Sequence, residues 1–117
     1  MTTVSIVEDN KEYRDALKSV IQDADGFVVT HVYGSAEDAM NIIDQPTNIA
    51  IVDIQLPGMN GIELIKHLRQ KDITTSFLVC SINDDDESIF NALKSGASGY
   101  ILKDSRSEQI IDDLNEL

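Results

Sequence analysis

The sequence has little of several residue types on which particular protein classes depend. It contains one cysteine, Cys80, so neither an internal disulfide nor a cysteine-rich metal site can form within the chain. No apolar run approaches the ~18 residues that a membrane-spanning helix needs. The first segment, MTTVSIVEDN, lacks the basic stretch and long apolar core of a secretory signal. We therefore expect a cytoplasmic protein without membrane contacts, in which Cys80 is a small buried hydrophobe.

Basic residues are also few. Lysine and arginine number 9 against 21 aspartates and glutamates, which gives a formal net charge of −12. This charge would repel a phosphate backbone, so we expect no direct nucleic-acid binding by this segment. Any DNA contact would belong to another domain.

The 117 residues are enough for one compact domain with one core. Short β-branched runs alternate with stretches of helical period, a pattern that predicts a parallel sheet with helices on both faces, a doubly wound α/β fold. The nearly continuous apolar content of the runs predicts strands buried on both faces. The five expected strands are residues 4–8, 27–32, 49–53, 77–81 and 99–103.

Apolar residues at helical spacing follow each expected strand and indicate the core faces of five helices. Ser35 with Asp38, and Ser105 with Glu108, have the spacing of capping boxes at the second and fifth helices. We assign these stripes no ligand role. They comprise Tyr13, Ala16, Leu17, Val20 and Ile21, then Ala36, Ala39, Met40 and Ile43, then Ile62, Ile65 and Leu68, then Ile89, Phe90 and Leu93, and finally Ile110, Ile111 and Leu114.

Residues with reactive or charged side chains stand at the ends of four expected strands: Glu8 and Asp9, Asp53, Ser81 and Lys103. Doubly wound sheets place their sites at the carboxyl ends of the strands. Three converging carboxylates would repel one another unless one is protonated or a hard cation binds among them, and Mg²⁺ fits that demand. Lys103 could pair with Asp53 and later with a phosphoryl oxygen, to which Ser81 could also donate.

Four segments, IVEDN, VDIQLPGMNGIEL, LVCSI and GASGYILKD, resemble the signature segments of receiver domains of bacterial two-component response regulators. The likeness spans essentially the whole chain. GYILKD is particularly similar to receivers attached to helix-turn-helix transcriptional output domains. The resemblance implies a flavodoxin-like (βα)5 fold with strand order 2-1-3-4-5. It also implies that residues 1–117 are a receiver domain excised from a longer regulator with a C-terminal output domain.

Carried over by position, the resemblance makes Asp53 the phosphoryl acceptor. Glu8 and Asp9 would be the acidic pair that supports Mg²⁺. Gln55 would add its backbone carbonyl, so the implied metal ligands are Glu8, Asp9, Asp53 and Gln55.

The same resemblance makes Lys103 the lysine of the site, Ser81 the hydroxyl residue that follows the phosphoryl group, and Tyr100 the aromatic whose rotamer reports the switch. Asn83 and Gln55 would flank the path of the hydrolytic water. Ile82 is large where many relatives have a small residue, and we expect it to restrict access to the site.

Two further departures concern Ser81 and Asp104. Ser81 replaces the more usual threonine and retains the hydroxyl but loses the methyl group that restricts rotamers. Asp104 follows Lys103 where many receivers have proline, which leaves the geometry of that peptide bond open.

The implied function is a signalling switch and not an enzyme with a separate substrate. A sensor histidine kinase would donate the phosphoryl group to Asp53, water would remove it, and an output domain or effector would respond. Phosphorylation could also promote homodimerisation.

Three alternatives remain open at this point. A Mg²⁺-dependent phosphohydrolase could use an aspartyl phosphate, but such enzymes of the haloacid dehalogenase type place Asp-x-Asp after the first strand, where this chain has Glu8-Asp9-Asn10. A receiver-like interaction module independent of phosphorylation would not need Asp9, Asp53, Ser81 and Lys103. A flavin-binding module would need a phosphate-binding loop after the first strand, and the sequence has none there.

Overall fold

The computed structural model describes residues 1–71 and 73–117, and it has five strands that alternate with helices along the chain. All strands are parallel and form one sheet in the order β2-β1-β3-β4-β5, as the resemblance implied. The elements are β1 (Thr2–Val7), α1 (Lys11–Gln22), β2 (Phe27–Tyr33), α2 (Ala36–Ala39), the 3₁₀ helix η1 (Met40–Ile43), β3 (Ile49–Asp53), α3 (Gly61–Arg69), β4 (Ser76–Ser81), α4 (Asp86–Lys94), β5 (Gly99–Leu102) and α5 (Ser107–Asn115).

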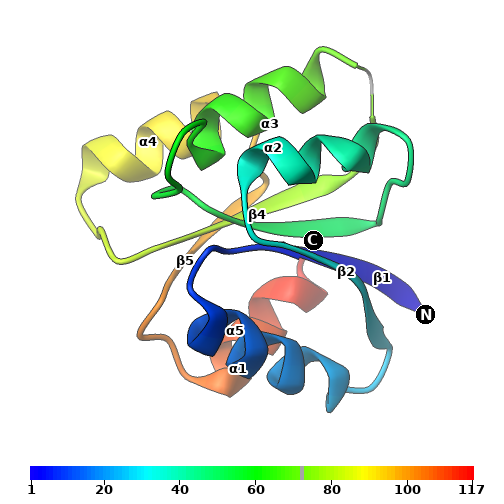
Figure 1. Cartoon of the computed structure of the whole chain (residues 1–117). Helices are drawn as coiled ribbons and strands as arrows, with labels where there is room; N and C mark the ends of the chain where they lie inside the picture. Colours follow the sequence, from blue (N-terminus) through cyan, green and yellow to red (C-terminus); the bar gives the residue numbers. More distant parts are fainter. Residues whose placement is uncertain (72) are drawn as a thin grey trace.

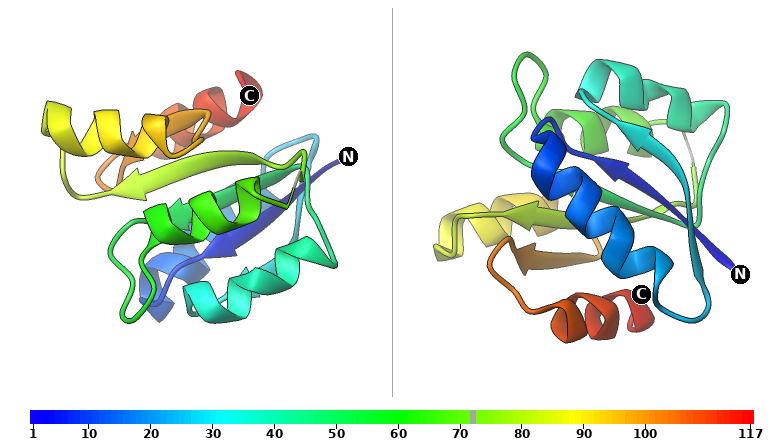
Figure 2. Two further views of the ribbon diagram at one scale, coloured as in Figure 1. Left: turned by 90° about the horizontal axis from the view of Figure 1, so that it is seen from above. Right: turned by 60° about the horizontal axis from the view of Figure 1, so that its bottom comes forward.

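Helices cover both faces of the sheet (Figure 1). The helices α2, α3 and α4 lie on one face, and α1 and α5 lie on the other; the right-hand view of Figure 2 shows α1 and α5 in front of the sheet. Each face has its own apolar core, one containing Leu64, Leu68 and Phe77, the other containing Ile21 and Leu114. The doubly wound architecture predicted from the alternating pattern is therefore confirmed.

The expectation that all five strands are buried on both faces is correct only in the middle of the sheet. Every residue of β3 is buried, as are the last four of β1 and the last five of β4. The strand β2 exposes Thr30 and Val32; it lies at the edge of the sheet, with β1 as its single neighbouring strand.

The second expected helix changes its period part-way. After one α-helical turn the chain continues as the 3₁₀ helix η1, in which residues three apart share a face. Ala36, Ala39 and Ile42 follow this spacing and are fully buried. Ile43, which the α-helical period placed in the core, is only partly buried.

The expected core face of α4 is wrong. Phe90 is 64% exposed and Leu93 is 45% exposed, whereas Ala92 is fully buried. Successive residues of an α-helix are rotated by about 100°. Phe90 precedes Ala92 by two residues and so points away from the sheet. In α1, Ala16 is likewise exposed, at the margin of the stripe formed by Leu17 and Ile21.

Helix starts agree with expectation at α2 and differ at α5. Ser35 caps α2 by accepting a hydrogen bond from the Asp38 amide at 3.0 Å. The helix α5 begins one residue later than expected, with Arg106 as its N-cap, and Arg106 makes no side-chain capping bond. The capping box expected from Ser105 and Glu108 therefore does not form. In the described part of the chain, no helix has the length and apolarity required to cross a bilayer.

Candidate functional site

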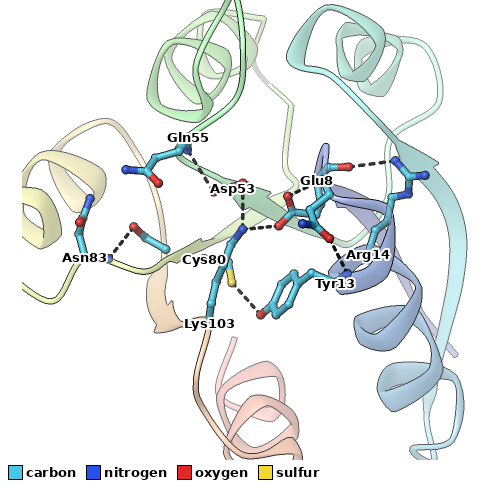
Figure 3. Close-up of polar contacts among 10 residues, drawn as sticks. Glu8, Tyr13, Arg14, Asp53, Gln55, Cys80, Asn83 and Lys103 are labelled. Atoms are coloured by element: carbon cyan, nitrogen blue, oxygen red, sulfur yellow. Dashed lines mark hydrogen bonds and ion pairs between the residues drawn. The ribbon is translucent and has the colours of Figure 1, made fainter.

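The chemically active side chains predicted from the strand ends come together at one edge of the sheet (Figure 3). Parallel register aligns the ends, with Asp53 of β3 opposite Cys80 of β4 and Ser81 of β4 opposite Leu102 of β5. The strands β1 and β5 end one residue earlier than expected, so Glu8 and Lys103 follow them directly. Their amides still bond to neighbouring strands, Glu8 to the Tyr33 carbonyl at 3.0 Å and Lys103 to the Ser81 carbonyl at 2.9 Å.

Three carboxylates form an acidic cluster. Glu8, Asp9 and Asp53 each offer an oxygen, and these oxygens lie within 4.8 Å of one another. Glu8 and Asp53 are only 2% and 3% exposed, whereas Asp9 is exposed to solvent. Oxygen ligands at this spacing, with one side open to water, suit Mg²⁺, which keeps several of its own waters. The donor set therefore fits the expected cation.

Lys103 lies against two members of this cluster. Its Nζ is 2.6 Å from Glu8 Oε1 and 3.1 Å from Asp53 Oδ2. The expected pairing with Asp53 is present, and the shorter contact with Glu8 was not anticipated. Burial by itself would lower the pKa of the Lys103 ammonium, but its hydrogen bonds with both carboxylates outweigh burial and raise that pKa overall. The ammonium thus balances part of the negative charge of the cluster.

Local contacts fix the first acid of the cluster. The second oxygen of Glu8, Oε2, accepts a hydrogen bond from the Asn10 amide at 3.1 Å, and the Glu8 carbonyl accepts one from Arg14 Nη1 at 3.1 Å. Asn10 is also the N-cap of α1, where its side chain accepts from the Tyr13 amide. The start of α1 therefore holds Glu8 in the site, a role for Asn10 and Arg14 that the sequence reading missed.

The loop after β3 holds Asp53 from the other side. The Gln55 amide donates to Asp53 Oδ1 at 3.1 Å. A side chain at Gly61 would collide with the Asp53 carbonyl, so the close approach of α3 to the end of β3 requires glycine. Glu37 of α2 fastens the same loop by accepting from the Met59 amide at 3.1 Å. Glu37 carried no signal in the sequence, because this contact joins segments 22 residues apart.

Ser81, Asn83 and Tyr100 form a connected chain beside the acids. The buried Ser81 hydroxyl accepts a hydrogen bond from the Asn83 amide at 3.1 Å, and the Tyr100 hydroxyl donates to the Asn83 carbonyl at 2.6 Å. Figure 3 shows Asn83 on the loop between β4 and α4. Ile82, between Ser81 and Asn83, is 67% exposed, so it is not a core residue packed under α4. The bond between Lys103 and Asp104 is trans.

Tyr13 and Cys80 complete the surroundings of Lys103. Burial raises the pKa of the Cys80 thiol to about 11, and the Tyr13 hydroxyl lies 3.1 Å from its sulfur. Cys80 is buried as expected. Tyr13, which the sequence suggested only as a core position, lies with its ring 4.9 Å from Lys103 Nζ.

The sequence matches a known protein family. Residues 4–115 match the model of the response regulator receiver domain. This chain belongs to the receiver domain family. The match covers almost the whole chain, so the resemblance seen in the short signature segments is confirmed.

Individual relatives agree with this result. The receiver is 29% identical over 115 residues to the nitrate/nitrite response regulator protein NarL of Escherichia coli K12, covering 97% of this chain and 53% of that protein. It is 25% identical over 116 residues to the chemotaxis protein CheY of Listeria monocytogenes, covering 99% and 98% of the two chains. The receiver thus spans about half the length of NarL and nearly all of CheY.

Solved structures share the fold. A LuxR-family two-component response regulator from Aurantimonas sp. superposes with a TM-score of 0.93 at 25% identity, covering 99% of this receiver and 84% of that chain. Strand order and helix placement therefore follow those of known response regulators.

Proposed function

We propose that this receiver is a phosphorylation-dependent switch in which Asp53 accepts a phosphoryl group from a sensor histidine kinase. The observation that carries the proposal is the position of the Asp53 carboxylate. It is almost fully buried at a strand end, one oxygen bonded to the Gln55 amide and the other to Lys103, with two further carboxylates beside it. This combination of acceptor, ammonium and acidic cluster is what phosphoryl transfer to a carboxylate requires.

In the proposed reaction, an Asp53 oxygen forms a bond to phosphorus while the bond between phosphorus and the kinase histidine nitrogen breaks. The electron pair of the broken bond stays on the histidine nitrogen, and the ring leaves as the neutral imidazole because its other nitrogen carries a proton taken from solvent. Mg²⁺, held by Glu8, Asp9, Asp53 and the Gln55 carbonyl, would supply positive charge to the phosphoryl oxygens. Lys103, already at 3.1 Å from Asp53, neutralises further charge on the same group.

The phosphoryl group would then be sensed through Ser81. Its hydroxyl would turn to donate to a phosphoryl oxygen, while Lys103 forms an ion pair with the same group. Ser81, Asn83 and Tyr100 are already hydrogen-bonded in series, which supports a coupling between the acceptor and the surface of α4, β5 and α5. Repacking of Tyr100 would change that surface for partners.

Hydrolysis of the acyl phosphate by water would reset the switch. We propose that Gln55, Ile82 and Asn83 influence the access of water and of small phosphoryl donors. The exposure of Ile82 next to Ser81 supports an effect on access.

We further propose that residues 1–117 form the receiver part of a longer cytoplasmic regulator whose C-terminal output domain binds DNA. The coverage of NarL, of which this receiver matches 53%, supports an additional domain. The net charge of −12 supports a separate domain as the DNA-contacting part. An effector or a second copy of the receiver would respond to phosphorylation through the surface of α4, β5 and α5, with the acceptor chemistry unchanged.

Incubation with acetyl phosphate and Mg²⁺, followed by mass spectrometry of the intact protein, tests the proposal. We expect a mass gain of one phosphate in the parent and none in Asp53→Asn, which keeps the shape of the side chain but removes its nucleophilic carboxylate. An unlabelled parent would favour the phosphorylation-independent interaction module. Turnover of generic phosphomonoesters would favour the phosphohydrolase.

A further inference from the structure

Lys103 has a third anchor besides the carboxylates of Glu8 and Asp53. Its Nζ lies 4.9 Å from the centroid of the Tyr13 ring. Figure 3 shows Tyr13 reaching from α1 toward the end of the Lys103 side chain. An ammonium group at this distance from an aromatic face is attracted by the ring quadrupole, and the attraction grows when both groups are withdrawn from water.

Tyr13 is itself held at two points, its backbone and its hydroxyl. Its backbone amide donates to Asn10 Oδ1 at 3.0 Å, and its hydroxyl lies 3.1 Å from the Cys80 sulfur. Burial raises the pKa of both the Tyr13 hydroxyl and the Cys80 thiol, so both groups are neutral at physiological pH. The ring therefore presents a fixed, uncharged face to Lys103.

This third contact differs in kind from the other two. The proposed reaction converts the Asp53 carboxylate into an acyl phosphate, and the proposed metal site recruits Glu8. Both carboxylates thus gain other binding partners during the proposed reaction, whereas the face of the Tyr13 ring takes part in none of its steps. A lysine side chain has a flexible four-carbon stem, so a contact that does not change during the reaction limits where the ammonium can go.

We propose that Tyr13 is a positioning residue for Lys103, with its ring face holding the ammonium at the phosphorylation site. This role rests on the proposed phosphorylation of Asp53. It assigns to α1 a part in the reaction beyond holding Glu8.

Two variants of Tyr13 separate the ring face from the hydroxyl. Tyr13→Leu keeps an apolar side chain but removes the aromatic face, and Tyr13→Phe keeps the face but removes the bond to Cys80. NMR of the Lys103 ε-methylene protons measures the contact directly, because an aromatic face shifts nearby protons upfield. Labelling with acetyl phosphate and Mg²⁺ measures the consequence. We expect Tyr13→Leu to lose the ring-current shift and to be labelled about fivefold more slowly, while Tyr13→Phe keeps the shift and the parental rate.

Each alternative result overturns the proposal. A parental labelling rate in Tyr13→Leu would show that the contact does not serve the reaction. Equal slowing in both variants would assign the effect to the bond with Cys80 and not to the ring face. A labelled parent with unshifted Lys103 protons would refute the positioning role alone, whereas a parent that takes up no phosphate would refute the proposed function and the positioning role with it.

Discussion

At the scale of single residues, the site is governed by how one ammonium is shared among several acids. Lys103 contacts Glu8 and Asp53, the two buried carboxylates, and leaves the exposed Asp9 without a basic partner among the described salt bridges. A cation that enters the cluster therefore competes with Lys103 for Glu8 and Asp53, but it does not compete with Lys103 for Asp9. Asp9 should contribute strongly to metal affinity and little to the folded state.

Replacing Asp9 tests this division. Asp9→Ala should weaken Mg²⁺ binding markedly, because it removes one of the three carboxylate ligands. The free energy of unfolding without metal should stay unchanged or rise, because repulsion within the cluster falls. Calorimetric titration gives the affinity and a separate urea melt gives the stability. Glu116→Ala, which removes an exposed acid from the end of α5, is the matched control and should leave the affinity intact. Unchanged Mg²⁺ affinity in Asp9→Ala would contradict the proposed ligand set.

The exposure of Ile82 leads to different predictions for the labelling rate and the stability of Ile82→Ala. Ile82→Ala should accelerate labelling by acetyl phosphate by about tenfold or less, equivalent to roughly 1.4 kcal/mol of barrier. Its stability should change by only about 0.5 kcal/mol, because the side chain is 67% exposed.

Stopped-flow labelling beside a thermal melt measures both quantities for Ile82→Ala. Phe90→Ala removes a similarly exposed apolar side chain from α4 and should leave the labelling rate alone. Parental labelling by Ile82→Ala would show that Ile82 does not restrict access.

At the scale of elements, sequence periodicity predicted the five strands and the five α-helices, but it placed wrong residues on the buried faces of the second and fourth helices. Alternating strand and helix patterns depend on local spacing, which the sequence shows directly. The 3₁₀ period of η1 and the outward rotation of Phe90 depend on how each segment packs against the sheet. Strand-end residues such as Asp53 and Lys103 could be predicted as a site because parallel topology brings strand ends together. Tyr13 could not, because its partner Cys80 lies 67 residues away.

Among the α-helices of the described residues, α4 buries the fewest side chains. Ala92 is its single buried residue, and the adjoining loops are tied by hydrogen bonds from Tyr100 to the Asn83 carbonyl and from Arg69 to the Gly96 carbonyl. In contrast, α3 buries three large apolar side chains, Leu64, Ile65 and Leu68.

Backbone amides of α4 should therefore exchange with solvent deuterium much faster than those of α3, since local opening exposes less apolar surface. Residue-resolved hydrogen exchange of the unphosphorylated protein measures this, with α3 as the internal reference. Equal protection of the two helices would show that α4 is not a separately mobile element.

At the scale of the whole molecule, two apolar cores support the sheet, and the one shared with α1 and α5 reaches the site through Cys80. Burial raises the pKa of the Cys80 thiol from 9.0 to about 11. Between these values the unfolded chain has lost the thiol proton while the folded chain keeps it. The unfolded state then binds fewer protons, so stability falls as the pH rises. The raised pKa values of Tyr13 and Lys103 act in the same direction.

The free energy of unfolding of the parent should decline between pH 9.0 and about 11. Titration of Cys80 should account for a loss of roughly 2–3 kcal/mol across this interval. Urea unfolding at a series of pH values measures the decline. Cys80→Val, which removes the thiol from the strand, should be less stable at neutral pH but lose less stability across this window. Parallel curves for parent and variant would show that the thiol does not titrate as described.

Every role proposed for the residues of the site depends on Asp53 being the phosphoryl acceptor. Borohydride reduces an aspartyl phosphate to homoserine, so peptide mass spectrometry after labelling with acetyl phosphate and Mg²⁺, followed by reduction, locates the modified residue. We predict homoserine at position 53 in the parent, dependent on Mg²⁺, and at none of the other acids of the site. Homoserine at position 9, 5-hydroxynorvaline (the reduction product of a glutamyl phosphate) at position 8, or the absence of homoserine from position 53 in a protein that has gained a phosphate would contradict the account.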